Sequence, residues 1–205
     1  LLHMPTHIDV LCGDYMNVVL RNEAAIKADR KFLRREGADN FYSVYRCHNY
    51  HFKIYGAMFL GQPGAALQAA EELIDTLPSE TLRPMADWFE GFIPMKQHVL
   101  IRFGRWQDIL DQDLPEDEDL YSVTIAMMRY ARTVALANLH RIADAERERD
   151  EFFTALLLGF PILYGRAGHA IKGTDIVLRN GVWACKYRNS WGRWGDNGYG
   201  YDSLD

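Results

Sequence analysis

The fold is decided by the segment Leu60-Gly61-Gln62-Pro63-Gly64-Ala65-Ala66-Leu67-Gln68-Ala69-Ala70. A short turn at Gly61 leads into small and aliphatic residues at the three- and four-residue spacing of a helix. Similar turns recur at Gly13, Gly104 and His140, so successive turns lie 48, 43 and 36 residues apart. The segment therefore predicts one unit of a helical repeat, in which two helices are joined by this turn.

Further positions repeat relative to each turn. The residues two positions after the turns are apolar or carry a ring: Tyr15, Pro63, Trp106 and Ile142. The residues five positions after the turns are small or aliphatic: Val18, Ala66, Ile109 and Ala145. Breaks in the helical spacing fall at residues 37–40, 77–79 and 114–116, where turn-forming residues gather. Twelve positions after the turns lie Ala25, Leu73, Glu116 and Phe152, and the third unit departs from the pattern there because Pro115 shortens its second helix.

This pattern resembles the tetratricopeptide repeat (TPR) family over most of residues 4–158, most clearly at residues 60–70. The family repeats every ~34 residues, so the longer periods here predict lengthened helices and loops. The resemblance implies a mainly α fold, a TPR-like α-solenoid of about four helical hairpins. Stacking of the hairpins would bury their apolar faces and leave a concave groove. In the family, that groove binds peptides or partner proteins.

Histidines occupy matched positions before these turns. His3 and His51 lie ten residues before a turn, and His7, Tyr55 and His98 lie six residues before one. His3 with His7, and His48 with His51, have spacings that place each pair on one helical face. In the TPR family, these positions of the first helix point into the groove. The resemblance therefore implies a ligand-binding set made of His3, His7, His48, His51, Tyr55 and His98.

Three interpretations of the histidines stay open. Imidazole suits Zn, Cu, Ni or Fe, so a divalent metal could be bound by His3, His7, His48, His51 and His98. Histidine also titrates near neutrality, which fits a polar, pH-sensitive groove. The third interpretation is that these side chains only pack beside loops. Apart from a metal such as Zn, we expect no cofactor.

The spacing of apolar residues changes near residue 160, and we divide the chain into a helical domain at 1–158 and a β segment at 159–205. Asp175–Leu178 and Val182–Tyr187 are predicted strands, because glycine, aromatic and β-branched residues dominate there. Arg179-Asn180-Gly181 joins them, and Asn-Gly strongly favours a hairpin turn. A third strand is expected to start at His169. We therefore expect a small antiparallel β element.

This segment resembles the papain-like (C1) cysteine peptidases over about 40 residues. The matching motifs, in order along the chain, are Gly168-His169-Ala170, Asn189-Ser190-Trp191-Gly192, Trp194-Gly195 and Asn197-Gly198-Tyr199. The resemblance implies His169 as general base and acid, Asn189 as the side chain that orients the imidazole, and Trp191 as its shield from water. Such a site activates a cysteine thiolate beside the imidazolium.

The family's nucleophile motif, Cys-Gly-Ser-Cys-Trp at the start of a long helix, does not occur in the sequence. The three cysteines are Cys12, Cys47 and Cys185, and none is predicted at the start of a helix facing His169. We therefore expect an incomplete peptidase-like segment. Two alternatives remain: another chain completes the site, or one of the three cysteines serves as the nucleophile.

Charge and composition exclude some classes of function. The net charge of the chain is −5, but residues 159–205 carry six Lys/Arg and four Asp/Glu, so the helical part is more acidic than the whole. An acidic body argues against nucleic-acid binding, which depends on neutralising phosphates. No apolar run approaches the ~20 residues that span a bilayer, and no signal peptide is visible, although the chain begins Leu-Leu-His. We expect a soluble, cytoplasmic protein without membrane contact.

Three functions follow in order of preference. The first is a scaffold whose groove binds a peptide, a protein or a small polar ligand. The second is a papain-like cysteine peptidase whose nucleophile lies outside this sequence. The third is metal binding by the histidines. A homo-oligomer or a complementing chain is compatible with each of them.

Overall fold

The computed structural model describes residues 2–159, 163–166, 169–179, 182–189 and 199–203, and after Ala155 it describes the backbone with only the side chain of Lys186. The described chain is mainly helical, as predicted. Its α-helices are α1 (Thr6–Leu11), α2 (Tyr15–Glu36), α3 (Tyr42–Phe59), α4 (Pro63–Asp75), α5 (Ser79–Leu82), α6 (Ala86–Phe89), α7 (Met95–Arg102), α8 (Trp106–Leu110), α9 (Ser122–Asn138) and α10 (Ile142–Gly159). Two 3-10 turns flank α6, namely η1 (Arg83–Met85) and η2 (Glu90–Phe92).

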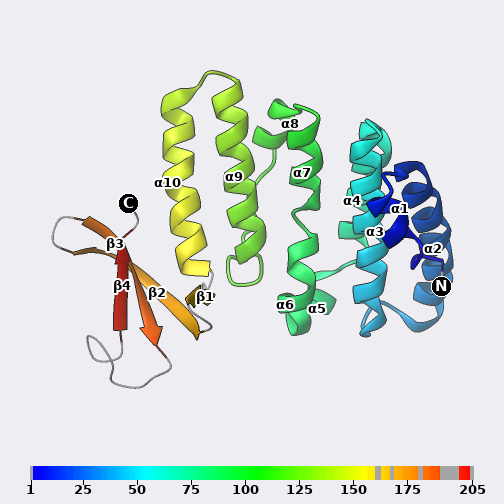
Figure 1. Cartoon of the computed structure of the whole chain (residues 1–205), viewed down its shortest axis with the longest axis horizontal. Helices are drawn as coiled ribbons and strands as arrows, with labels where there is room; N and C mark the ends of the chain where they lie inside the picture. The colour runs from blue at the N-terminus through cyan, green and yellow to red at the C-terminus, as the bar shows by residue number, and fades with distance from the viewer. Residues whose placement is uncertain (1, 160–162, 167–168, 180–181, 190–198, 204–205) are drawn as a thin grey trace.

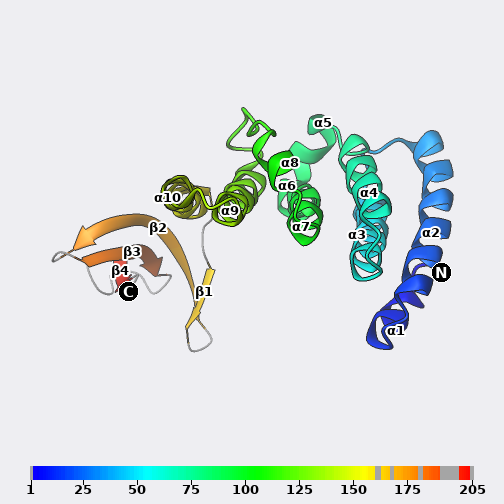
Figure 2. The same cartoon turned by 90° about the horizontal axis from the view of Figure 1, so that it is seen from above.

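The helices pair into four hairpins: α1 with α2, α3 with α4, α7 with α8, and α9 with α10. Figure 1 shows them in a row, with α1 and α2 at one end and α10 beside the sheet at the other. Seen from above, the row arches, and α3 and α7 lie on the opposite side from α4 and α8 (Figure 2). We call the side formed by α1, α3 and α7 the inner face.

The four turns that join the two helices of each hairpin share one backbone geometry. Their turn residues all have a left-handed φ, which is +72° at Gly13, +68° at Gly61, +64° at Gly104 and +58° at His140. In each turn the next residue donates its N–H to the carbonyl five positions earlier, as in Gln62 N to Ala57 O at 2.9 Å. This bond closes the end of the first helix in a Schellman motif. The second helix then begins at the very next residue: Tyr15, Pro63, Trp106 and Ile142.

The positions predicted to pack behind these turns are buried. The residues five positions after the turns are at most 6% exposed: Val18, Ala66, Ile109 and Ala145. Close approach matters most where α3 meets α2, because a Cβ added at Gly56 would lie 2.9 Å from Val18 Cγ1. Any residue with a Cβ at position 56 would push the two helices apart, so the glycine permits their contact.

The core is centred on α3, α4 and the short helices that follow. Tyr50, Ile54, Leu73 and Phe89 are at most 2% exposed there. Burying each such side chain stabilises the fold by about 1.5–3 kcal/mol. A smaller cluster joins α7 and α8 to α9 through Leu100, Ile109, Ala131 and Ala135. The hairpins therefore depend on their neighbours for burial, as stacked units do.

One helical detail differs from the sequence predictions. His3 precedes α1 and lies in a turn, so His3 and His7 are not two positions of one helix. The reason is Pro5, which favours a helix start and lacks the N–H that a helix interior needs. The second helix of the third hairpin is short, as expected, but α8 (five residues) ends at Leu110, before Pro115 is reached.

The tail forms four strands, β1 (Leu163–Arg166), β2 (His169–Arg179), β3 (Val182–Asn189) and β4 (Tyr199–Ser203). They pair antiparallel in the order β1-β2-β3-β4. His169 starts the long strand β2 and not a separate third strand, because a register shift between Gly173 and Asp175 lets one strand continue. Residues 180–181, where we predicted the Asn-Gly turn, lie outside the described residues.

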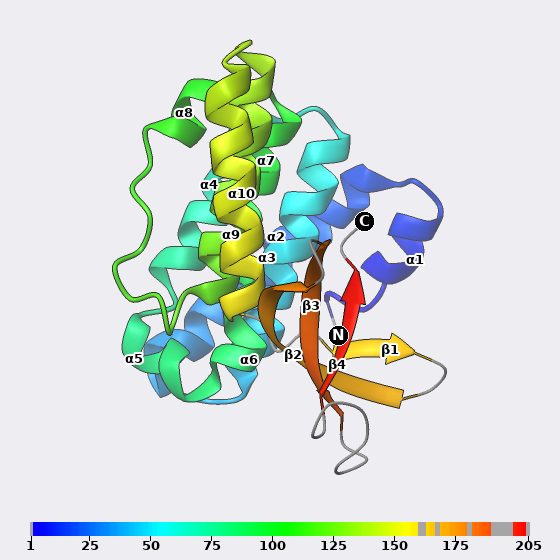
Figure 3. The same cartoon turned by 90° about the vertical axis from the view of Figure 1, so that its left-hand side faces the viewer.

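The sheet lies beside the last helix of the row, with β2 in contact with α10. Figures 2 and 3 agree that β1 and α1 both lie on the inner side of the helix row. The helix α10 ends at Gly159, one residue past the predicted end of the helical part. Among the described residues, no helix has the length and apolar character needed to cross a bilayer.

Candidate functional site

Three histidines meet on the inner face, where the segment before α1 contacts α3. One ring nitrogen from each of His3, His7 and His48 lies within 4.8 Å of the others. The His3 ring centroid lies 4.9 Å from that of His7 and 4.7 Å from that of His48. Nε2 of His3 and Nε2 of His7 are 3.1 Å apart, close enough for one to donate a hydrogen bond to the other. We call these three residues the histidine triad.

Asn22 of α2 fixes the ring of His3 from behind. Its side chain is fully buried, and its Nδ2 donates to the Val18 carbonyl at 2.7 Å. Its Oδ1 therefore faces His3 Nδ1 at 2.8 Å and can only accept. His3 must carry its proton on Nδ1, which leaves a lone pair on Nε2 directed at His7.

Phe52 packs against all three rings of the triad. Its ring centroid lies 4.9 Å from His3, 4.7 Å from His7 and 4.7 Å from His48. Phe52 and His48 are one helical turn apart on α3, which brings both rings to the same face. An apolar ring beside the imidazoles limits their contact with water on that side.

The surroundings favour neutral imidazoles. Burial, and to a smaller extent the neighbouring His3, His51 and His7, lower the pKa of His48 to about 4. Burial also lowers the pKa of His3, although its bond to Asn22 acts in the opposite direction. Because metal ions bind the uncharged form of imidazole, these lowered pKa values favour the ligating form of His3 and His48.

The other two predicted histidines are not part of this cluster. His51 lies one turn along α3, with its ring centroid 6.5 Å from that of His48 and 5.9 Å from that of Phe92. His98 lies on α7 and is exposed. The five-histidine metal set is therefore reduced to three residues that can share one ion. Asn22 and Phe52 were not predicted from the sequence. The signal available for Asn22 was its place among the apolar residues of one helix face.

Tyr55 belongs to an aromatic group at the other end of α3. Its ring lies 4.6 Å from that of Phe59 and 6.2 Å from that of Tyr15. The guanidinium of Arg102 lies 5.9 Å from the centre of the Phe59 ring, in cation–π range. Of the other predicted ligand-binding residues, Tyr55 therefore lies on α3 and His98 on α7.

In the tail, the sheet places the backbones of two predicted catalytic residues close together. Asn189 ends β3 and pairs with Ile171, and His169 starts β2 two residues before Ile171. Such diagonal neighbours on adjacent strands are about 7–8 Å apart. Trp191 lies outside the described residues.

The cysteines are distributed over three different elements. Cys47 on α3 is fully buried, and burial raises the pKa of its thiol to about 12. Cys12 is exposed but directly follows α1, at the opposite end of the molecule from β2 and β3 (Figure 1). Cys185 lies within β3 and pairs with Ile176 in register. Neither of the first two therefore offers a reactive thiol beside His169.

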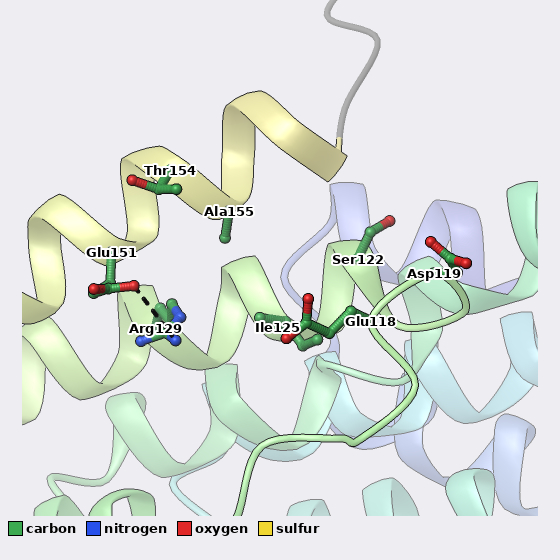
Figure 4. A pocket seen from close by; sticks show the side chains of 8 residues that line it. All are labelled: Glu118, Asp119, Ser122, Ile125, Arg129, Glu151, Thr154 and Ala155. Carbon is green, nitrogen blue, oxygen red and sulfur yellow. Dashed lines mark ion pairs between the residues drawn. The ribbon is translucent and has the colours of Figure 1, made fainter. Parts of the chain in front are cut away.

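A separate pocket of about 330 Å³ lies between α9, α10 and the loop before α9. Figure 4 shows its lining: Glu118, Asp119, Ser122, Ile125, Arg129, Glu151, Thr154 and Ala155. Arg129 is paired within it, at 3.0 Å from Glu148 and 3.6 Å from Glu151. The pocket is acidic and open, and none of the histidines considered above lines it, so we place the candidate site at the triad and the inner face.

Comparisons of the chain with protein-family models, with curated proteins and with solved structures find no match in any of the three. The function therefore has to be argued from the chemistry of these residues.

Proposed function

We propose that the chain is a TPR-like binding module whose inner face receives an extended peptide or a segment of a partner protein. The observation that carries the proposal is the shared geometry of the four turns. Units that repeat one turn present equivalent positions of their first helices on one side, and stacking extends that side into a continuous surface. His7, Tyr55 and His98 are such equivalent positions.

The chemistry of this surface suits a polar, extended ligand. Tyr55 supplies a ring and a hydroxyl, and His98 supplies a ring nitrogen that can donate or accept a hydrogen bond. Arg102, on the same helix as His98, is exposed and adds a positive charge that can pair with a carboxylate. Rigid helices hold these groups in place, which reduces the entropy lost when a ligand binds.

The test uses peptides selected from a displayed library of random sequences. We expect the selected peptides to lose at least tenfold in affinity when Tyr55→Ala and His98→Ala are combined, because their hydrogen bonds and ring contacts are removed. The matched control changes exposed glutamines of α4 and α8, Gln68→Ala with Gln107→Ala, and should leave the dissociation constant unchanged. Equal losses in both variants would exclude the inner face as the binding surface.

A papain-like peptidase completed by another chain is the second candidate function. The position of His169 diagonally across from Asn189 favours it, because a base and its orienting group must lie on neighbouring parts of the backbone for their side chains to hydrogen-bond. A thiol-directed covalent inhibitor of cysteine peptidases should then label the assembly that supplies the cysteine. Labelling that persists in the His169→Ala variant would remove this candidate.

A further inference from the structure

We propose that the histidine triad binds one divalent transition-metal ion of the class that prefers imidazole, such as Zn²⁺, with a fourth coordination position open to water. The proposal is independent of peptide binding on the inner face. It rests on the distances between the ring nitrogens, on the bond that orients His3, and on the chemical type of the ligands.

The distances between the ring nitrogens suit one shared ion. A tetrahedral Zn²⁺ with Zn–N bonds of about 2.0–2.1 Å holds its nitrogen ligands about 3.3 Å from one another. Nε2 of His3 and Nε2 of His7 already lie 3.1 Å apart. The third nitrogen, from His48, lies within 4.8 Å of both. To hold one tetrahedral ion with the other two, the His48 nitrogen has to move to about 3.3 Å from each of them.

The orientation of the His3 ring also favours a bound metal ion. Histidines that bind metals almost always donate their other ring N–H to an oxygen, which fixes the ring and raises the basicity of the ligating nitrogen. Asn22 Oδ1 accepts this bond from His3 Nδ1 at 2.8 Å, and Asn22 is itself held by its bond to Val18. A fully buried asparagine that directs one histidine lone pair toward a second histidine is an arrangement suited to an ion between them.

The chemical type of the ligands decides which class of ion the triad would bind. Three imidazole ligands suit Zn²⁺, Cu²⁺ or Ni²⁺, whereas Mg²⁺ and Ca²⁺ prefer oxygen ligands. Three protein ligands leave a tetrahedral ion with one further position, as in zinc sites that keep a bound water. Phe52 covers one side of the rings, so that position faces away from it. His7 is exposed, which gives an ion access from solvent.

The test is calorimetric titration of the whole metal-free chain with ZnCl₂. We expect one ion per chain and at least a hundredfold loss of affinity in His7→Ala. Because His7 is exposed, this variant should retain the melting temperature of the metal-free wild type. The matched control is His98→Ala, which removes an exposed histidine outside the triad and should bind Zn²⁺ as the wild type does.

Two further measurements separate a built site from surface binding. Asn22→Ala should weaken Zn²⁺ binding by about 10–100-fold, because His3 loses the acceptor that orients it. Co²⁺ in place of Zn²⁺ should show the intense visible absorption of a four-coordinate ion, and His48→Ala should abolish it. The proposal is overturned if the wild type binds no Zn²⁺, or if His7→Ala and His98→Ala reduce binding equally.

Discussion

At the scale of single residues, the chain repeats one unusual backbone conformation four times. Three of the four turns use glycine, which reaches a left-handed φ without a steric penalty, and the fourth uses His140. A residue with a Cβ pays about 1–2 kcal/mol for this conformation. The fourth hairpin is therefore closed by the least favourable of the four turn residues.

This difference gives a matched pair of substitutions. Gly61→Ala should destabilise the protein by about 1 kcal/mol, because nothing lies within 4 Å of the added Cβ and only backbone strain remains. His140→Gly should stabilise it by a similar amount for the converse reason. Urea unfolding followed by circular dichroism measures both. A stabilising Gly61→Ala, or a destabilising His140→Gly, would contradict the shared turn geometry.

Glu90 shows how one carboxylate can join two distant elements. Its Oε1 accepts a hydrogen bond from Thr124 N at 2.7 Å, in the first turn of α9, and the side chain is only 5% exposed. Burial raises the pKa of Glu90 above its ordinary value of 4.5, although the N–H bonds of Thr124 and Val123 oppose this. The folded state therefore holds this proton more tightly than the unfolded state does.

The sign of the pH effect follows from this raised pKa. As the pH rises above the ordinary glutamate range, the folded state must release a proton that it favours, so Glu90 contributes less stability. Glu90→Gln keeps an acceptor for Thr124 without the charge, and its stability relative to the wild type should increase from pH 4.5 to pH 7. Glu90→Ala should cost about 1–3 kcal/mol, because the buried N–H loses its partner. Thermal unfolding across this pH range tests both; a wild type that gains on Glu90→Gln as the pH rises would refute the argument.

At the scale of elements, the sequence predicted the turns better than the helices between them. The turns were found because they depend on local chemistry: a glycine or a small polar residue followed by a helix start. The residues buried five positions later were predicted for the same reason. The short helices α5 and α6 were not predicted, because the core residues Leu82 and Phe89 hold them in place through contacts distant in sequence.

The candidate site was predictable only in part. Features that depend on spacing along the sequence were predicted, and those that depend on contacts between distant segments were not. Spacing relative to the turns and to one another identified the five histidines. It could not show that α1 would begin only after Pro5, which leaves His3 outside the helix that carries His7. Nor could it identify Asn22, which acts through contact between α2 and the segment before α1. The interface of α2 with α3 contains other buried polar groups, such as Asp29, which accepts from Tyr42 and Asn49. These pairings are tertiary and leave no periodic pattern in the sequence.

At the scale of the whole molecule, four hairpins form an arched row that ends in a four-stranded sheet (Figure 2). The arch places α1, α3, α7 and the sheet on one side (Figures 2 and 3), and these three helices carry His7, His48, Tyr55 and His98. A ligand that followed the inner face would run from the triad toward α7. We therefore propose the row of first helices as the functional surface.

The most direct measurement is hydrogen–deuterium exchange of the whole chain with and without a saturating library-selected peptide. We predict slower exchange in α3 and α7 on binding, with little change in α4 and α8, because the first helices contact the ligand and the second helices do not. Protection confined to α4 and α8, or to the acidic pocket between α9 and α10, would contradict the assignment of the inner face.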